Sequence, residues 1–333
     1  MEIKVKHSLV ILACFLIFAQ PLPAQTPADQ DDVIKTETDV TNLPFTVTDQ
    51  QRRFITTLRA EDVRVLEDGV PQQVFTFQRE TDRPLSIAFL IDISISQSVT
   101  LGAEKAAARG FIEKAVQSRK DQVAILPFTG QAFLELPLTR DLLSAYRVLQ
   151  EIEIAAPAYQ GAGRPLTGIK TGPGLPATPA EGSTAIWDAV ALTSSQVLGA
   201  TKDQRRRAII LLTDGLDTTS RVKRTTAIDN VLGAESVVYA IGIGNKNEGV
   251  DKGAIRELAE RTGGRAFFPK KDEDLESVFT EIEQELRTQY LIAYSSSNKK
   301  HDGTYRKITI EITNPDLKKF TVRHRPGYFA KSG

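Results

Sequence analysis

The sequence predicts a doubly wound α/β domain with a mainly parallel sheet, inserted between two β-rich flanks that pack together. Apolar strands alternate with amphipathic helices over residues 83–288, which is typical of a parallel sheet covered on both faces. Residues 33–82 and 289–330 instead show short segments of alternating apolar and polar residues, which is typical of antiparallel strands. Because neither flank is large enough to form a hydrophobic core of its own, we expect the two flanks to share one core.

The pattern of residues 1–24 predicts a signal peptide. A short basic stretch, MEIKVKH, precedes the apolar run SLVILACFLIFA, and PLPA before Gln25 offers a small residue for cleavage. The run is too short to span a bilayer comfortably, and it continues past Cys14, which argues against lipid attachment there. We therefore expect an exported protein, periplasmic or secreted, with no retained transmembrane segment. Residues 25–32 are expected to form a mobile linker.

Charge and cysteine content narrow the class of protein. Lysine plus arginine and aspartate plus glutamate each total 42, whereas a nucleic-acid-binding protein usually has a basic surplus or stripe. The one dense basic cluster, Arg205-Arg206-Arg207, precedes an apolar strand and is expected to be a solvated strand entrance. Removing the signal peptide also removes the single cysteine, so the mature chain is expected to fold without a disulfide.

The N-terminal flank contains the turn signal EDGVPQ between the strands VRVL and QVFTF. In the central domain the expected parallel strands are LSIAFLID, DQVAILPF, RAIILLTD, SVVYAIGIG and RAFFP, with the proline-containing QAFLELPL as a short edge strand. The expected helices are residues 101–118, LLSAYRVLQEI, AIWDAVALTSSQVL, GAIRELAERTGG and DLESVFTEIEQEL. Strands return in the C-terminal flank as QYLIAYS, TYRKITIEI and FTVRHRPGYF.

One long loop interrupts the central domain. Residues 155–182 are rich in glycine and proline, and loops of this length without regular structure are usually functional or disordered. The loop leads into the segment that carries Thr184, so we expect it to approach the same edge of the sheet. Two interpretations stay open: a rim that selects a partner, and a tolerated surface insertion.

Oxygen-bearing side chains gather at the carboxyl ends of the expected strands. Asp92 ends the first strand of the domain, and Ser94 and Ser96 follow at alternate positions, which project on one side of an extended chain. Asp214 follows the strand RAIILLT, and Thr184 is expected in the first turn of a helix whose start faces the same edge. Ligand sites in open parallel sheets lie at this edge.

Two carboxylates and three hydroxyls form an all-oxygen set that suits a hard divalent cation. Mg²⁺ accepts such ligands and keeps water in its shell, and Mn²⁺ or Ca²⁺ are alternatives. A position left to water can be taken by a carboxylate of another molecule. The pattern therefore predicts a cation site that a protein partner presenting a carboxylate can complete.

The segments DISIS, GSTAIWDAV and LLTDG resemble the three parts of the metal-ion-dependent adhesion site (MIDAS) of von Willebrand factor type A domains. The similarity continues into YAIGIG and LAERTGGRAFF and covers about residues 84–288. It implies a Rossmann-like fold and makes Asp92, Ser94, Ser96, Thr184 and Asp214 the metal-coordinating residues. The flanks, including HRPGYF, resemble those of exported bacterial proteins with such a domain between β-rich ends. Ile95 stands where many members of the family have glycine, and it would crowd the rim of the site.

Simpler interpretations compete for some of these residues. A lone Asp-x-Ser-x-Ser is most often a helix cap, and Thr184 could cap its own helix. Asp188 and Asp217 are expected to be surface or helix-cap acids rather than ligands, and Glu181 is expected to be solvated.

Three functions remain open. The first is an exported protein-binding module that uses the metal site, and the second is a scaffold or assembly module whose metal site is idle or structural. The third, a hydrolase within the flanks, has the least support. The sequence contains no Gly-x-Ser-x-Gly elbow and no phosphate loop, and its histidines, His7, His301 and His324, lie outside the α/β domain. We therefore expect a protein that is not an enzyme.

Overall fold

The computed structural model describes residues 40–331 apart from 80–82, 118, 156–163, 166–182, 201–204, 245–248 and 318. The expected signal peptide and linker, Cys14, Glu181 and most of the long loop lie outside the described residues. Within the described part, no helix is both long and apolar enough to cross a membrane.

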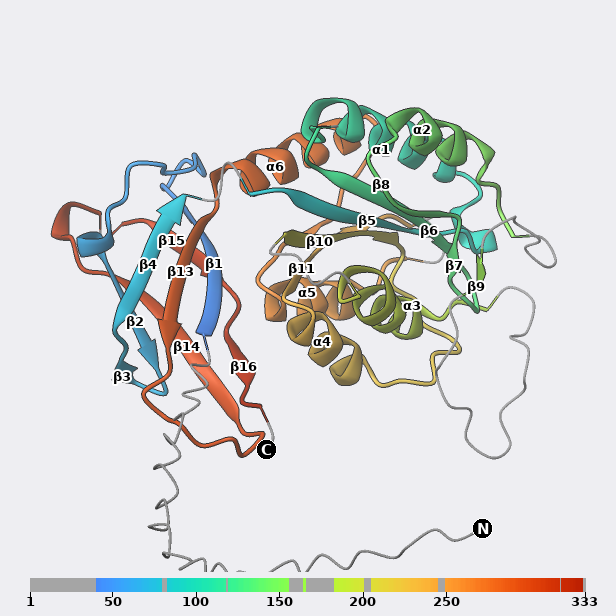
Figure 1. Ribbon diagram of the computed structural model, residues 1–333. Helices are drawn as coiled ribbons and strands as arrows, with labels where there is room; N and C mark the ends of the chain where they lie inside the picture. Colours follow the sequence, from blue (N-terminus) through green and yellow to red (C-terminus); the bar gives the residue numbers. More distant parts are fainter. Residues whose placement is uncertain are drawn as a thin grey trace, which may run out of the picture. The chain divides into compact units, whose positions relative to one another are not determined.

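The central sheet contains six strands in the order β12-β11-β10-β5-β6-β8 (Figure 1). Five of them run parallel, and β8 pairs with β6 antiparallel at the edge. The strands are β5 (Leu85–Asp92), β6 (Gln122–Phe128), β8 (Leu136–Thr139), β10 (Arg206–Thr213), β11 (Ser236–Gly242) and β12 (Ala266–Phe267). The predicted mainly parallel sheet is confirmed.

Helices cover both faces of this sheet, as a doubly wound fold requires (Figure 1). One apolar cluster packs α1 (Leu101–Ala115), α2 (Leu142–Glu151) and α6 (Asp274–Thr288) on one face. A second cluster packs α3 (Ile186–Leu192), α4 (Arg224–Gly233) and α5 (Lys252–Arg261) on the other. Every residue of β5 is buried, which explains why its sequence is a continuous apolar run rather than an alternating one.

The strand order reverses beside β5. The chain proceeds outward from β5 to β6 and β8, and then returns to the other side of β5 with β10, β11 and β12. The carboxyl ends of β5 and β10 therefore flank the switch point of the sheet, where open α/β sheets bind their ligands. These are the ends that carry Asp92 and Asp214.

The remaining strands form two four-stranded sheets, each of which combines strands that precede and follow the α/β part. The first has the order β15-β1-β13-β4 and the second β16-β14-β2-β3. Their bounds are β1 (Val40–Thr48), β2 (Val63–Glu67), β3 (Val70–Pro71), β4 (Val74–Arg79), β13 (Tyr290–Ser295), β14 (Tyr305–Ile312), β15 (Thr321–His324) and β16 (Gly327–Phe329). A minor pair joins β7 (Phe133–Leu134) to β9 (Arg164–Pro165).

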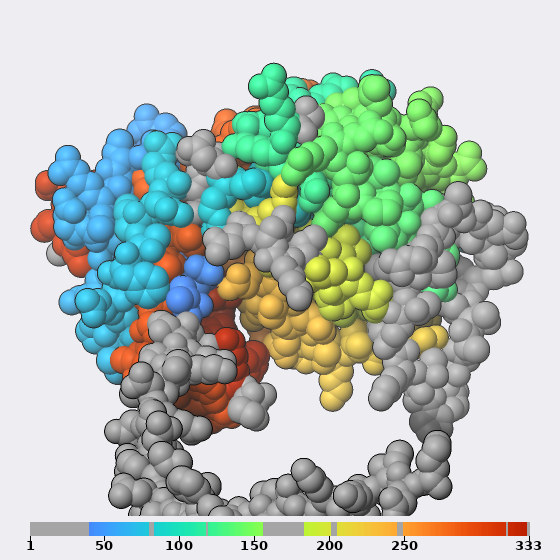
Figure 2. All heavy atoms as spheres, in the orientation of Figure 1, coloured from blue at the N-terminus to red at the C-terminus, as the bar shows by residue number. Residues whose placement is uncertain are grey.

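The two β-sheets share one apolar core. Phe45 of β1 stacks on Tyr290 of β13 with ring centroids 5.2 Å apart, and Val65 of β2 and Ile308 of β14 belong to the same cluster. The Tyr290 hydroxyl also accepts a hydrogen bond from the backbone of Leu58 at 3.0 Å. In Figure 2 atoms of the first strands (blue to cyan) lie against atoms of the last strands (orange to red).

The basic cluster before β10 is not a solvated entrance, so that expectation is wrong. Arg205 is buried and donates hydrogen bonds to the carbonyls of Leu85 (3.2 Å) and Lys120 (2.6 Å). Arg206 donates to the carbonyls of Arg83 and Leu286. These acceptors come from distant parts of the chain, so local charge density did not reveal them.

Candidate metal centre

Asp92 is the last residue of β5 and is fully buried. Its Oδ1 accepts a hydrogen bond from the backbone N–H of Ser94 (3.0 Å), and its Oδ2 accepts one from the hydroxyl of Thr213 (2.7 Å). Thr213 ends the neighbouring strand β10. The carboxylate is thus held in place from both strands at the switch point.

Ser94 and Ser96 lie together, but not through an extended chain as the sequence predicted. Residues Ile95–Gln97 form a 3₁₀ turn that begins after Ser94. This turn brings the two hydroxyl oxygens within 3.0 Å of each other. The predicted one-sided projection was derived for the wrong backbone conformation, although the two hydroxyls do adjoin one another.

Asp214 follows β10 directly and is almost fully buried. Its Oδ1 accepts a hydrogen bond from the backbone N–H of Leu216 at 2.9 Å, which fixes the tight turn after the strand. Gly215 within this turn has φ of +81°, and an added Cβ would lie 2.8 Å from the Ile255 side chain. Glycine is therefore required for the turn that presents Asp214.

Thr184 precedes helix α3 instead of lying in its first turn. The helix begins at Ile186 with Ala185 at its N-cap and no side-chain cap, so the prediction of a first-turn position is wrong. Thr184 does not cap the helix either. The backbone N–H of Thr184 donates to the hydroxyl of Thr218 at 2.8 Å. The Thr184 carbonyl accepts a hydrogen bond from the backbone N–H of Thr218 at 2.9 Å.

The segment around Thr184 crosses the end of β5. On one side it is bonded to Thr218, in the loop after β10. On the other, the N–H of Ala185 donates to the carbonyl of Thr129 (2.8 Å), and the Thr129 hydroxyl donates to the carbonyl of Ser183 (2.6 Å). Thr129 follows β6, and β5 lies between β6 and β10 in the sheet. Thr184 is therefore brought to the edge that carries Asp92.

The long loop starts at the same place. Ala155, its first residue, donates from its N–H to the carbonyl of Ile93 at 2.9 Å. Ile93 itself follows Asp92 and donates to the carbonyl of Phe128 at 2.9 Å. Both described ends of the loop, Ala155 and Ser183, thus lie beside the candidate site.

The electrostatics favour a cation at this edge. Burial raises the pKa of Asp92 to about 6, and the neighbouring negative charge of Asp214 adds to the increase. Among the described residues, neither carboxylate forms an ion pair with a lysine or arginine side chain. Two buried carboxylates without a counter-ion are costly unless a cation accompanies them.

The donor set fits a hard divalent cation and not a softer metal. Asp92 and Asp214 supply carboxylate oxygens, and Ser94, Ser96 and Thr184 supply hydroxyls. Over the described residues, no cluster of three or more His, Cys, Asp or Glu side chains is placed to hold a metal. A site with two carboxylates and neutral hydroxyls is the type that Mg²⁺ accepts with water in its remaining positions.

The structure adds two residues that sequence reasoning did not single out. Thr213 supports Asp92 from β10, as described above. Glu104, in the first turn of α1, is 0 % exposed, and within the described part of the chain neither of its carboxyl oxygens has a hydrogen-bond partner. Burial raises the pKa of Glu104 to about 8, with smaller contributions from Asp92 and Asp214. It lies one helical turn before the buried Ala108, and that spacing was a signal for an inward-facing position.

Asp188 and Asp217 hold the loop after β10 in place. Asp217 Oδ1 accepts from the N–H of Ile186 at 2.8 Å, so this acid caps the start of α3 from another segment. Asp188 is buried, and its Oδ1 accepts from the N–H groups of Arg221 (2.8 Å) and Val222 (2.9 Å). Asp217 matches the expected cap role, whereas Asp188 is neither on the surface nor at a cap.

Apolar side chains surround the site where it meets solvent. Ile95 is 56 % exposed and Val99 is 77 % exposed, both in the segment between β5 and α1. Leu216, two residues after Asp214, is 38 % exposed. Exposed apolar side chains close to a polar cluster are typical of a protein interaction site.

Solved structures of three proteins are similar to this chain. Proximal thread matrix protein 1 from the mussel byssus, in a structure with a zinc-occupied MIDAS motif, superimposes with a TM-score of 0.50 at 16% identity, covering 66% of this chain and 50% of that one. A von Willebrand factor type A protein from Catenulispora acidiphila gives 0.48 at 12% identity over 90% and 75% of the two chains. BatB from Bacteroides thetaiotaomicron gives 0.42 at 20% identity over 60% and 98%.

No protein-family model and no curated protein matches the sequence. The chain spans half the length of the mussel protein. The α/β part has the fold of von Willebrand factor type A domains, as the sequence resemblance implied.

Proposed function

We propose that this protein is an exported binding protein, periplasmic or secreted, that engages an acidic residue of a protein partner through a bound Mg²⁺. Asp92, Ser94, Ser96, Thr184 and Asp214 would hold the ion, which supplies a positive centre for the partner's carboxylate. We propose no enzymatic activity. The observation that carries the proposal is the pair of buried carboxylates, free of ion pairs among the described residues, at the switch point of the sheet.

Several further observations support it. The Ser94 and Ser96 hydroxyls are 3.0 Å apart, and the Thr184 segment is bonded over the end of β5. The exposed Ile95, Val99 and Leu216 offer apolar surface around the ion, which favours a protein partner over a free small acid. The zinc-occupied motif of the mussel protein supports a divalent cation in a site of this fold.

A Mg²⁺ titration of the purified mature protein tests the metal. We expect Asp92→Ala to lose measurable binding and keep its fold, because the site lies at the edge of the sheet. Asp141→Asn is the matched control, since Asp141 caps α2 through Leu143 and Ser144 outside the site and asparagine caps equally well. Wild-type affinity in Asp92→Ala would show that the ligand assignment is wrong.

A pull-down from envelope extract, with and without a chelator, tests the partner. We expect capture by the wild type to be lost with chelator and in Asp92→Ala, and retained in Asp141→Asn. Mg²⁺ binding together with chelator-insensitive capture would instead favour the alternative function, a scaffold or assembly module whose metal is idle or structural. In either function the β-sheets formed by the two flanks would present the α/β part.

A further inference from the structure

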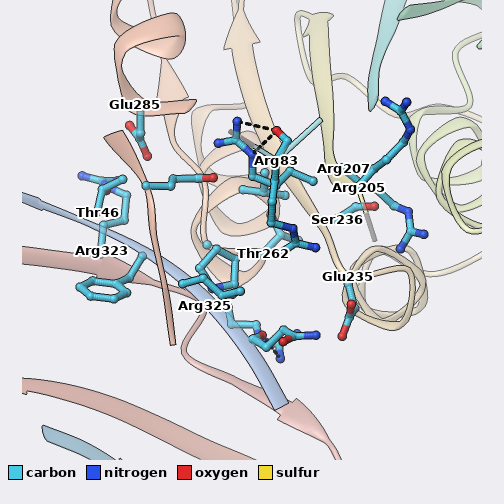
Figure 3. A pocket seen from close by; sticks show the side chains of 18 residues that line it. Thr46, Arg83, Arg205, Arg207, Glu235, Ser236, Thr262, Glu285, Arg323 and Arg325 are labelled. Carbon is cyan, nitrogen blue, oxygen red and sulfur yellow. Dashed lines mark hydrogen bonds between the residues drawn. The ribbon is translucent and has the colours of Figure 1, made fainter. Parts of the chain in front are cut away.

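A cavity lies at the opposite end of the central sheet from the metal centre. Its walls include residues at the amino ends of β5, β10 and β11 and residues of β1, β13 and β15 (Figure 3). The cavity measures about 60 Å³, several times the ~10–15 Å³ that a single water needs. It has no role in the proposed metal-dependent binding.

Positively charged side chains dominate the lining. Two glutamates, Glu235 and Glu285, also contribute. The lining arginines are Arg83, Arg205, Arg206, Arg207, Arg323 and Arg325. Among the described lining residues, six arginines outnumber two glutamates, and arginine stays protonated at any physiological pH.

The burial and hydrogen bonding of Arg325 are the most informative among these residues. Its side chain is 9 % exposed, and its Nη2 donates to the carbonyl of Asn42 at 3.0 Å. Among the described residues, its buried Nε has no hydrogen-bond partner and no carboxylate lies within 4 Å of the guanidinium group. A buried guanidinium without a counter-ion is costly unless an anion accompanies it.

Arg325 is held in place by the close approach of the α/β part. Gly263, in the turn after α5, has φ of +88°, and an added Cβ would lie 2.9 Å from the backbone nitrogen of Arg325. Arg323, two residues earlier, donates to the carbonyl of Gly264 at 3.5 Å. The same glycine turn thus positions both arginines at the wall of the cavity.

The arginines on the opposite wall donate to backbone carbonyls. Arg205 bonds to Leu85 and Lys120, and Arg207 donates to the carbonyl of Ala234 at 3.2 Å. The dashed lines in Figure 3 mark the two bonds from Arg206 to the Arg83 carbonyl. These bonds fix the guanidinium groups of Arg205–Arg207 at the wall opposite Arg323 and Arg325.

The two glutamates offset part of the positive charge of these arginines. Burial raises the pKa of Glu285, and the charge of Arg323 opposes that rise. Burial lowers the pKa of Arg325, and the charge of Glu235 opposes that fall. Glu285 is buried, and its Oε2 lies 3.6 Å from Nη1 of Arg265. Arg265 is not one of the arginines that line the cavity. Glu235 is exposed at the rim, and no ion pair of 4 Å or less joins it to Arg325 among the described residues.

We propose that this cavity binds a small divalent oxyanion of the phosphate or sulfate class, with Arg323 and Arg325 as its principal ligands. Guanidinium groups match tetrahedral oxyanions because two parallel N–H groups can bond two oxygens. The anion would supply the counter-charge that Arg325 lacks. It would also join the two walls, because Arg323 lies in β15 and Arg325 between β15 and β16, whereas Arg205–Arg207 belong to the α/β part.

Calorimetric titration of the full-length protein with inorganic phosphate, with sulfate and with acetate, at constant ionic strength set by chloride, tests the proposal. We expect saturable binding of phosphate and sulfate and much weaker binding of acetate. Arg325→Gln should weaken phosphate binding at least tenfold. Glu235→Gln should strengthen it about twofold, because it removes a negative charge from the rim.

Two controls separate anion binding from loss of fold. Arg64→Gln removes an exposed arginine of β2 that pairs with Glu311 outside the cavity, and it should leave phosphate affinity unchanged. Arg323→Gln gives a second ligand variant if Arg325→Gln lowers the melting temperature too far, and it should also weaken binding tenfold.

Two results of these titrations would overturn the proposed anion site. Absence of saturable phosphate or sulfate binding by the wild type, up to tens of millimolar, would overturn the proposal. So would equal weakening by Arg64→Gln and Arg323→Gln, since that would reflect general surface charge. Mg²⁺ affinity should be the same in all four variants, so this test is independent of the metal proposal.

Discussion

The two ends of the central sheet carry opposite charge for opposite purposes. At the carboxyl end, Asp92 and Asp214 lie buried after neighbouring strands and would hold a cation. At the amino end, Arg205–Arg207 enter β10 beside a cavity that Arg323 and Arg325 complete. The carboxyl end is assembled within the α/β part alone, whereas the amino end needs residues from the C-terminal strands.

This difference shows how the flanks add a site to a common fold. Ligands of parallel sheets normally bind at the carboxyl ends of the strands, and the metal centre follows that rule. The amino ends become usable here because β1, β13 and β15 supply the second wall. Four experiments test this difference between the two ends of the sheet.

Deletion of the C-terminal strands should give the largest effect. Removing residues 289–331 takes away β13 and β14, which pair with β1 and β2 and share their core. We expect the N-terminal strands to become protease-sensitive and phosphate binding to disappear. Mg²⁺ affinity should stay within about twofold, because no proposed metal ligand is removed.

Limited proteolysis and Mg²⁺ calorimetry measure these outcomes. The corresponding deletion of residues 40–79 is the matched variant, and it should expose the C-terminal strands in the same way. Protease resistance of the remaining flank in either variant would show that the flanks do not depend on a common core.

Acid should weaken ligand binding at the carboxyl end and not at the amino end. Because burial raises the pKa of Asp92 to about 6, protons compete with Mg²⁺ below that value and not above it. We expect Mg²⁺ affinity to fall about fivefold between pH 6 and pH 5, as for one competing proton whose pKa is about 6. Sulfate affinity should not fall over this interval, because its arginine ligands do not titrate. Burial raises the pKa of Glu285, so any proton that this residue gains removes a negative charge from the lining.

The same pKa shift has the opposite consequence for the metal-free fold. The folded state binds the Asp92 proton more tightly than the unfolded chain does, so lowering the pH from 6 towards 4 should add stability through this group. Calorimetry in the two pH conditions, with and without Mg²⁺, measures both effects. A Mg²⁺ affinity independent of pH below 6 would contradict the role of Asp92.

Shortening the long loop tests whether the carboxyl end has its own specificity element. Replacement of residues 161–180 by a brief Gly/Ser link removes no proposed ligand, so Mg²⁺ affinity should not change. Partner affinity should fall about tenfold if one well-packed contact of ~1.4 kcal/mol is lost. Unchanged partner affinity would leave selection to Ile95 and the other apolar residues at the rim.

Replacing Glu104 should give the smallest effect. The raised pKa of about 8 means that the side chain is neutral near pH 7 and charged and buried above pH 8. Glu104→Gln removes that charge, so thermal melts should show a stabilisation of about 1 kcal/mol at pH 9. Little change is expected at pH 5, where the side chain is protonated in the folded state. Equal effects at both pH values would argue against titration of Glu104.

The sequence by itself determined the parallel sheet and the kinds of atom at its carboxyl edge. Continuous apolar runs such as residues 85–91 must be buried on both faces, and a carboxylate that ends such a run must lie at the sheet edge. Asp92 and Asp214 were therefore predictable from local pattern. Ser94 and Ser96 were named correctly, but their geometry depends on a 3₁₀ turn that alternation could not reveal.

Only the tertiary structure decided which distant residues meet. Thr184 reaches the metal edge through bonds to Thr218 and through Thr129, which the sequence separates by many residues. Arg205 and Arg325 are buried because their carbonyl acceptors come from strands far along the chain. A local sequence pattern predicts burial and secondary structure, whereas the residues that line a cavity depend on long-range pairing. That pairing placed an arginine-lined cavity at the end of the sheet opposite Asp92 and Asp214.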